Sequence, residues 1–191
     1  ADQAVAVEYD GVDVVVSTAQ DPTAQALTAQ DIARLAEIDG VESVAGLVRT
    51  TAVAQVQGAG RGIVLESLPE ATELRWQRWS SGRAPSGKDE VALTRRTLDV
   101  LSIGVGDRVA LGRAGAGREN YTVVGEIDVR GSARHTTSAY GIVTPEVARG
   151  LAGLEGDNVA LVAVEPGGDA EAVAAQVNGG QNSGGQNSGG Q

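Results

Sequence analysis

The chain has 191 residues, with 25 acidic and 15 basic side chains, which give a formal net charge of −10 at pH 7. It contains no Cys and one His, so cysteine-ligated metal centres, disulfide frameworks and sites built from several histidines are excluded. An acidic pI argues against a nucleic-acid partner, because binding to a phosphate backbone needs clustered positive charge. Hydrophobic residues make up 41% of the chain, which is enough to bury a core.

No apolar run approaches the about 20 residues needed to cross a bilayer, and the chain begins at Ala1 without a signal peptide. We therefore expect a soluble fragment excised from a longer protein. Residues 178–191 repeat Asn, Gly, Gln and Ser with a period of five and have no apolar or charged side chain. This composition predicts a flexible tail, either engineered or a natural linker, that carries no chemistry.

The N-terminal part reads as β–α–β over residues 1–57. A run rich in valine, residues 5–17, predicts a strand buried on both faces. Thr28 and Asp31 have the spacing of a capping box and precede a one-sided apolar pattern, which predicts a helix. From Val41 to Val56 the pattern is again that of an extended strand.

The middle part, residues 58–135, changes to a β-rich pattern punctuated by glycine. Short strands are predicted at 63–65 and 89–93, and Thr94 is expected to cap a short helix. Two further strands are joined by the glycine-rich segment 112–117, which indicates a hairpin.

The final part, residues 136–177, returns to alternating β and α patterns. Strands are predicted near 139–143 and 158–164, and helices after Thr144-Pro145 and after Asp169. The sequence thus predicts an α+β fold. The outer ranges 1–57 and 136–177 would form one α/β subdomain (β-α-β plus β-α-β-α), with 58–135 inserted as a β-rich subdomain. The two ends of the folded chain would then lie close together.

A search for catalytic constellations finds little. His135 lies among hydroxyl side chains, so a Ser–His pair is conceivable, but the Gly-x-Ser-x-Gly nucleophile elbow is absent. The paired carboxylates Glu126 and Asp128 would share one face of a strand, which is commonly the solvated face. We therefore expect no enzyme activity, no cofactor and no metal site.

Trp76 and Trp79 are two of only five aromatic residues, and Arg75 and Arg78 precede them. A helical turn over residues 71–79 would place both indole rings on one face. One interpretation is a hydrophobic plug between the two subdomains. The other is a partner-contact patch made of Arg75, Trp76, Arg78 and Trp79, because Trp and Arg are enriched at binding hot spots.

The sequence contains an ordered series of short motifs: Gly40–Val44, Gly82–Pro85, Asp89–Leu93, Leu101–Val109, Tyr121–Glu126 and Gly141–Pro145. This series resembles the extracytoplasmic core domain of ABC-transporter permeases of the MacB/FtsX type. In that family the domain lies between the first two transmembrane helices and consists of a porter-like part with an inserted β-rich part. Ile103-Gly104 stands where the family often has Leu-Gly, and no long coiled-coil segment for a partner is present.

The resemblance implies a non-catalytic domain on the outer side of a cell membrane that couples ATP-driven motion to a substrate or partner. Implied partners are the membrane helices of its own permease and a cytosolic ATPase subunit, with a second permease copy or an extracytoplasmic protein as further candidates. Two alternatives stay open: a secreted adhesion or regulatory module, and a hydrolase that uses His135 with a nearby serine.

Overall fold

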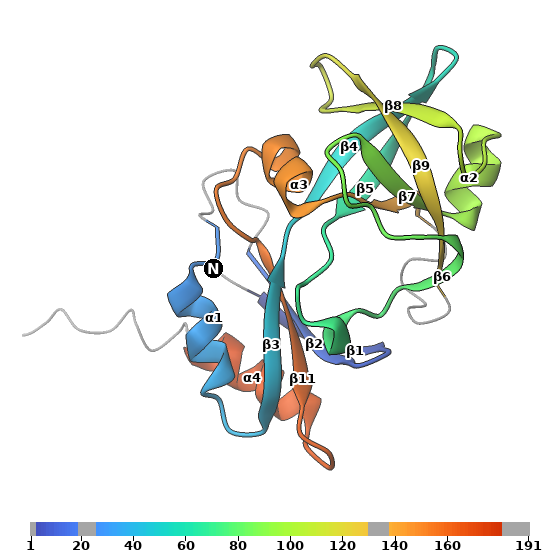
Figure 1. The fold of residues 1–191 in the computed structure, drawn as a ribbon. Helices are drawn as coiled ribbons and strands as arrows, with labels where there is room; N and C mark the ends of the chain where they lie inside the picture. Colours follow the sequence, from blue (N-terminus) through green and yellow to red (C-terminus); the bar gives the residue numbers. More distant parts are fainter. Residues whose placement is uncertain (1–2, 19–25, 130–137, 181–191) are drawn as a thin grey trace, which may run out of the picture.

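Two β-sheets, joined side by side, make up the folded chain (Figure 1). The computed structural model describes residues 3–18, 26–129 and 138–180. Helices and strands are mixed throughout these segments, so the predicted α+β class is confirmed. In these three segments no helix is long and apolar enough to span a bilayer.

The first sheet has four strands in the order β1-β2-β11-β3, and all of its neighbouring strands are antiparallel. Its elements are β1 (Gln3–Tyr9), β2 (Val12–Ser17), α1 (Ala29–Ala36), β3 (Val41–Leu47), β11 (Val159–Val164) and α4 (Ala170–Gly180). Because β2 and β3 both flank β11, they run parallel to each other and form a β–α–β unit with one strand inserted. Apolar side chains from α1 and α4 pack on one face of this sheet, which is where its main core lies.

The N-terminal strand differs from the prediction, because residues 5–17 form a hairpin rather than one strand. The chain turns at Asp10 and Gly11, and Gly11 has a φ of +78° that favours glycine. An Asp-Gly pair between apolar runs is a strong hairpin signal, so the turn could have been read from the sequence. The strand β2 is nevertheless buried on both faces, as predicted.

The two ends of the described chain lie together, as predicted. The side chain of Asn178 in α4 accepts a hydrogen bond from the backbone N–H of Ala4 at 2.9 Å and donates one to its carbonyl at 3.0 Å. The tail prediction is wrong for residues 178–180, which extend α4, because Asn178 has a backbone partner on the edge of β1. Residues 181–191 lie outside the described residues.

The second sheet has seven strands in the order β6-β9-β7-β10-β5-β4-β8, and β8 also pairs with β9. Its elements are β4 (Arg49–Val56), β5 (Ala59–Glu66), η1 (Thr72–Leu74), β6 (Arg78–Gly82), β7 (Glu90–Thr94), α2 (Arg95–Leu101), β8 (Arg108–Gly112), β9 (Glu119–Asp128), β10 (Tyr140–Ile142) and α3 (Pro145–Ala152). The extra pairing closes six of the strands into a barrel. The strand β6 pairs with residues 125–128 of β9, beyond the part of β9 that pairs with β8.

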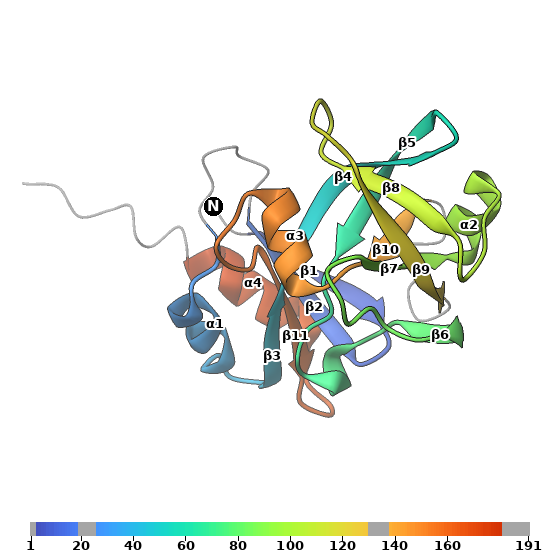
Figure 2. The same cartoon turned by 45° about the horizontal axis from the view of Figure 1, so that its top comes forward.

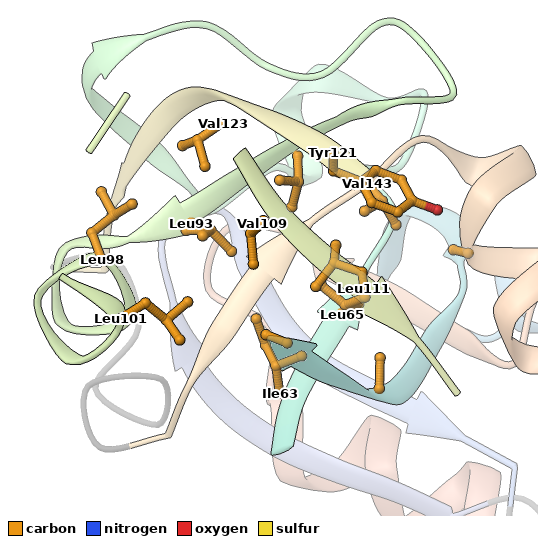
Figure 3. Packing of buried hydrophobic residues seen from close by; sticks show 14 of the residues in the cluster. Ile63, Leu65, Leu93, Leu98, Leu101, Val109, Leu111, Tyr121, Val123 and Val143 are labelled. Atoms are coloured by element: carbon orange, nitrogen blue, oxygen red, sulfur yellow. The ribbon is translucent and has the colours of Figure 1, made fainter. Parts of the chain in front are cut away.

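The barrel interior is filled by alternate residues of its strands (Figure 3). Successive strand residues point to opposite faces, so each strand contributes every second side chain to the core. The inward pairs are Ile63 and Leu65, Val91 and Leu93, Val109 and Leu111, and Tyr121 and Val123. Leu98 and Leu101 of α2 and Ala148 of α3 pack against the same cluster, so both helices are fixed to the barrel.

The chain passes from one sheet to the other at positions that differ from 57 and 136, the expected boundaries of the inserted part. The extended segment 41–56 is two strands, and β4 pairs with β5 and β8 in the second sheet. The strand β10, expected in the outer part, pairs with β5 and β7. The chain therefore changes sheets at Val48 and again after α3. That the two sheets are separate subdomains stays a prediction.

Several local predictions are confirmed. Thr28 and Asp31 form a reciprocal capping box at the start of α1, and the Thr94 side chain caps α2. The strands β8 and β9 form the predicted hairpin. The helical turn expected to span residues 71–79 is shorter than predicted. Only the 3₁₀ turn η1 forms, and the chain then extends into β6.

Two glycines of the sequence motifs allow one close backbone approach. Gly82, with a φ of +69°, faces Gly125 of β9 across the β6–β9 pair. A Cβ atom at Gly125 would overlap the carbonyl oxygen of Arg83, and one at Gly82 would overlap the carbonyl of Val124. The motif thus brings the segment before β7 into contact with β9.

We predict that Gly125→Ala lowers the free energy of unfolding by about 2–3 kcal/mol, because the new methyl group meets backbone atoms that cannot move aside. Gly62→Ala is the matched control, since a Cβ atom there meets nothing within 4 Å. It should change stability by no more than about 0.5 kcal/mol. Urea unfolding of both variants measures the difference, and equal values would contradict the packing argument.

Candidate functional site

Several long-range polar contacts meet at the junction between the two sheets. At Val48 the chain leaves β3 and enters β4 of the barrel. The backbone N–H of Val48 donates to the Ser67 hydroxyl at 2.9 Å, and the N–H of Ser67 donates to the Val48 carbonyl at 2.9 Å. Both residues are almost fully buried, so this crossing is held on both sides by hydrogen bonds.

Asn158, just before β11, fixes the same crossing from the first sheet. Its side-chain carbonyl accepts from the Arg49 backbone N–H at 2.7 Å, and its amide donates to the Arg49 carbonyl at 2.8 Å. Its own backbone N–H donates to the carbonyl of Leu47 at 3.1 Å. The carboxamide thus takes the place of a neighbouring strand between β11 and β4.

A buried ionic cluster lies next to this crossing. The carboxylate of Glu66, which is 2% exposed, accepts a hydrogen bond from Arg49 Nε at 2.8 Å and another from the Tyr140 hydroxyl. Tyr140 in turn accepts one from Gln77 Nε2 at 3.0 Å. Three strands and the segment before β6 therefore meet at one carboxylate.

The electrostatics of the cluster favour this bonding pattern. Burial raises the pKa of Tyr140 well above its ordinary value, and the nearby charge of Glu66 raises it further. The phenol therefore stays protonated and donates. Burial alone would lower the pKa of Arg49, but the charge and hydrogen bond of Glu66 outweigh it, so that pKa is raised. The Arg49 guanidinium thus stays protonated.

Aromatic rings pack around the cluster on the side of the first sheet. Trp76 lies between Tyr9 of β1 and Tyr140 of β10, with ring centroids 5.8 Å and 5.6 Å apart. Tilted pairs at such distances are favourable contacts. The arrangement joins the β1–β2 hairpin to the barrel, so the sheets are held by packing as well as by hydrogen bonds.

The four residues of the predicted partner patch do not form one patch. Trp76 is 1% exposed, so for it the partner prediction is wrong and the interpretation as a plug holds. Arg75 is half-buried and donates from Nε to the Pro69 carbonyl at 2.7 Å. Arg78 is exposed and lies 3.8 Å from Asp10, while Trp79 is half-buried on β6. For these three a partner role stays a prediction. His135 lies outside the described residues.

Sequence reasoning missed the ionic cluster, although one part of it was readable. Gln57 and Gly58 form the turn of the β4–β5 hairpin, and Arg49 and Glu66 are equally distant from that turn. Residues so placed face each other across antiparallel strands. Tyr140 and Gln77 come from distant segments, and no local pattern marks them as partners.

A second polar site explains the Gly-Arg-x-Pro motif. Glu90, at the start of β7, accepts two hydrogen bonds from the Arg83 guanidinium, at 2.9 and 2.5 Å, and others from the backbone N–H groups of Ser86 and Gly87. The hydrogen bonds from Arg83, followed by those from the backbone, hold the pKa of Glu90 far below its usual range. The motif therefore closes the loop between β6 and β7 around one carboxylate.

Neither polar site assembles the groups of a catalytic centre. Within the described ranges, no three His, Asp or Glu side chains come together in a way that could hold a metal ion. What the junction can do is mechanical, because it fixes the position of one sheet relative to the other.

We predict that Tyr140→Phe lowers the free energy of unfolding by about 1–3 kcal/mol, because it removes one buried hydrogen bond to Glu66 and one from Gln77. Glu66→Gln should cost about 3 kcal/mol by breaking the ion pair with Arg49. In the double variant the losses should fall short of additivity by at least about 0.5 kcal/mol, since both act on one network. Additive losses in urea unfolding would mean that the two groups do not interact.

We predict that Glu90→Gln is most destabilising at neutral pH. The folded-state pKa of Glu90 is lowered, so its contribution to stability is present above the unfolded pKa of about 4.3 and is lost as the pH falls. The melting temperatures of wild type and variant should therefore converge on acidification. A difference that stays constant from neutral pH down to pH 3 would rule out this linkage.

The comparisons with known proteins agree with this architecture. A profile of the family described as MacB-like periplasmic core domain matches residues 2–179. The extracellular domain of the noncanonical ABC-type transporter YknZ from Gram-positive bacteria is 14% identical, with a TM-score of 0.57 over 95% of each chain. The periplasmic region of MacB from Actinobacillus actinomycetemcomitans is 10% identical, with a TM-score of 0.56 over 88% of this chain and 83% of that one.

A search of curated proteins finds no significant match. The two structural likenesses show a shared fold, and the family profile covers nearly the whole folded chain. The chain therefore belongs to the MacB-like periplasmic core domains, the extracytoplasmic domains of ABC-type transporter permeases.

Proposed function

We propose that this domain is a non-catalytic lever that carries ATP-driven motion of its permease to a substrate or partner outside the membrane. The observation that supports it is the junction between the sheets, where Asn158, just before β11, binds both backbone groups of Arg49 at the start of β4. The Arg49 side chain in turn binds the buried Glu66 of the barrel. A lever needs such a joint, because a flexible one would dissipate the motion before it reached the far end.

The position of the chain ends supports the same proposal. Ala4 and Asn178 are hydrogen-bonded to each other, so both ends of the fold leave from the first sheet. Membrane helices that precede and follow the domain would then pull on one edge of the molecule. The barrel is carried along as a rigid body, in the manner of other transitions based on rigid-body rotation.

The partners follow from this role. The membrane helices of the permease would move the first sheet, and a cytosolic ATPase subunit would drive those helices. A second permease copy or an extracytoplasmic protein would receive the motion at the barrel. Catalysis has no part in the proposal, because the bonds of both polar clusters have a structural role.

Spin-label distances in the parent permease test the lever. The chain has no Cys, so Ala33→Cys on α1 and Lys88→Cys before β7 introduce labels at exposed sites of the two parts. We expect the distance from Ala33→Cys to a label in the membrane part to change on ATP binding. The distance between Ala33→Cys and Lys88→Cys should stay constant.

A permease whose ATPase subunit cannot bind ATP is the control, and neither distance should change in it. A constant distance to the membrane part in the active protein would contradict coupling. A nucleotide-dependent change within the domain would contradict the rigid lever, because the sheets would then move separately.

A further inference from the structure

A concavity of about 610 Å³ is lined by residues of the β4–β5 hairpin, the end of α2 and the β8–β9 hairpin. These elements lie at the end of the barrel farthest from α1 and α4 (Figures 1 and 2). Its lining residues include Gln55, Val56, Ile103, Arg108, Ala110 and Asn120. None of them belongs to the junction.

The concavity exists because two barrel strands separate. The pairing of β4 with β8 ends at Gln55 and Ala110, although β4 continues to Val56 and β8 begins at Arg108. Leu101 and Ile103 lie near the gap but do not close it. The edges of both strands that face the gap have no strand partner there, so extended backbone could be received between them.

The side chains that line the concavity are suited to a peptide. Gln55 and Asn120 both lie opposite Ala110 in the sheet and share its outward face, since their neighbours Ala54 and Tyr121 point into the core. Each carboxamide offers donors and an acceptor, the same groups that a peptide backbone presents. Among the described residues neither has a side-chain hydrogen bond.

The lining also offers apolar contact. Val56, at the end of β4, and Ile103, just after α2, line the concavity and are only partly buried.

The lining offers one available cation. Among the described residues that line the concavity, Arg108 and Asp107 are the charged ones. The Arg108 guanidinium has no hydrogen bond or ion pair with any described residue. Asp107 is already used, because it accepts from the Gly104 backbone N–H at 2.9 Å.

We propose that this concavity docks an extended, acidic segment of a partner polypeptide. Arg108 would take a carboxylate of the segment in a two-pronged contact. Gln55 and Asn120 would bind its backbone, and Val56 and Ile103 would cover its apolar side chains. This site would be where the proposed lever meets its partner, so its biological role rests on the proposed function. Binding of the peptide does not depend on the lever.

A peptide fits better than the other anionic candidates. A nucleic acid would be repelled by the rest of this acidic protein and would need more cations than Arg108 and its neighbours supply. An anionic membrane favours a flat basic face, whereas this surface is concave and lined by carboxamides. The test therefore includes lipid vesicles as a competing outcome.

Fluorescence anisotropy with a labelled hexapeptide of alternating Glu and Val tests the proposal on this chain. We expect saturable binding that weakens with salt, and no binding of the counterparts that alternate Lys or Ser with Val. Arg108→Gln should weaken the Kd about tenfold, and Gln55→Ala should weaken it less. Arg34→Gln, on exposed α1, is the charge-matched control and should leave the Kd unchanged.

Equal affinities of the Arg108→Gln and Arg34→Gln variants would overturn the proposal, as would equal binding of the acidic and serine peptides. Binding of phosphatidylglycerol vesicles that requires Arg108, without peptide binding, would overturn the choice of a polypeptide. Amide chemical shifts should move at Gln55, Arg108 and Asn120 and not around Asn178. Failure here would leave the spin-label test of the lever unaffected, because that test does not involve the concavity.

Discussion

The rest of the structure depends on one buried carboxylate. A charge such as that of Glu66 is costly to remove from water unless partners surround it. Here the partners are Arg49 of β4 and Tyr140 of β10, and Gln77 before β6 holds Tyr140. The carboxylate is therefore satisfied only when these elements are in their native positions. Such a group contributes less to net stability than to the selection of one native arrangement, because a shift of the barrel strands would leave the charge unpaired.

Two asparagines extend the same logic to the places where the chain crosses or ends. Asn158 binds both backbone groups of Arg49, and Asn178 binds both backbone groups of Ala4. Each carboxamide takes the position of a missing strand neighbour. One fixes the crossing between the sheets and the other fixes the last helix to the first strand, so a force applied at the chain ends acts on a connected body.

Local signals predicted local structure well and long-range contacts poorly. The Thr28 box, the Thr94 cap and the β8–β9 hairpin follow from neighbouring residues, and all three are confirmed. The division of the strands between sheets was misjudged because Val48 carries no turn signal and the bonds that bend the chain there come from distant residues. The junction was missed for the same reason. The Arg49–Glu66 pair was also missed, although the register of the hairpin made it readable. The partner prediction failed for Trp76 because a helical turn was assumed where the chain is extended.

The rigid junction and the distant concavity have a joint consequence. The barrel is closed, and its core is formed by interdigitated aliphatic side chains, so its walls cannot yield much to a load. Asn158 and the Tyr9–Trp76–Tyr140 contacts join this body to the sheet that holds both chain ends. In the proposed lever, a rotation of the first sheet would be carried to the far rim of the barrel, where the displacement is largest. A partner held at that rim would be moved farther than one bound beside the junction, which makes the barrel end the mechanically effective place for a docking surface.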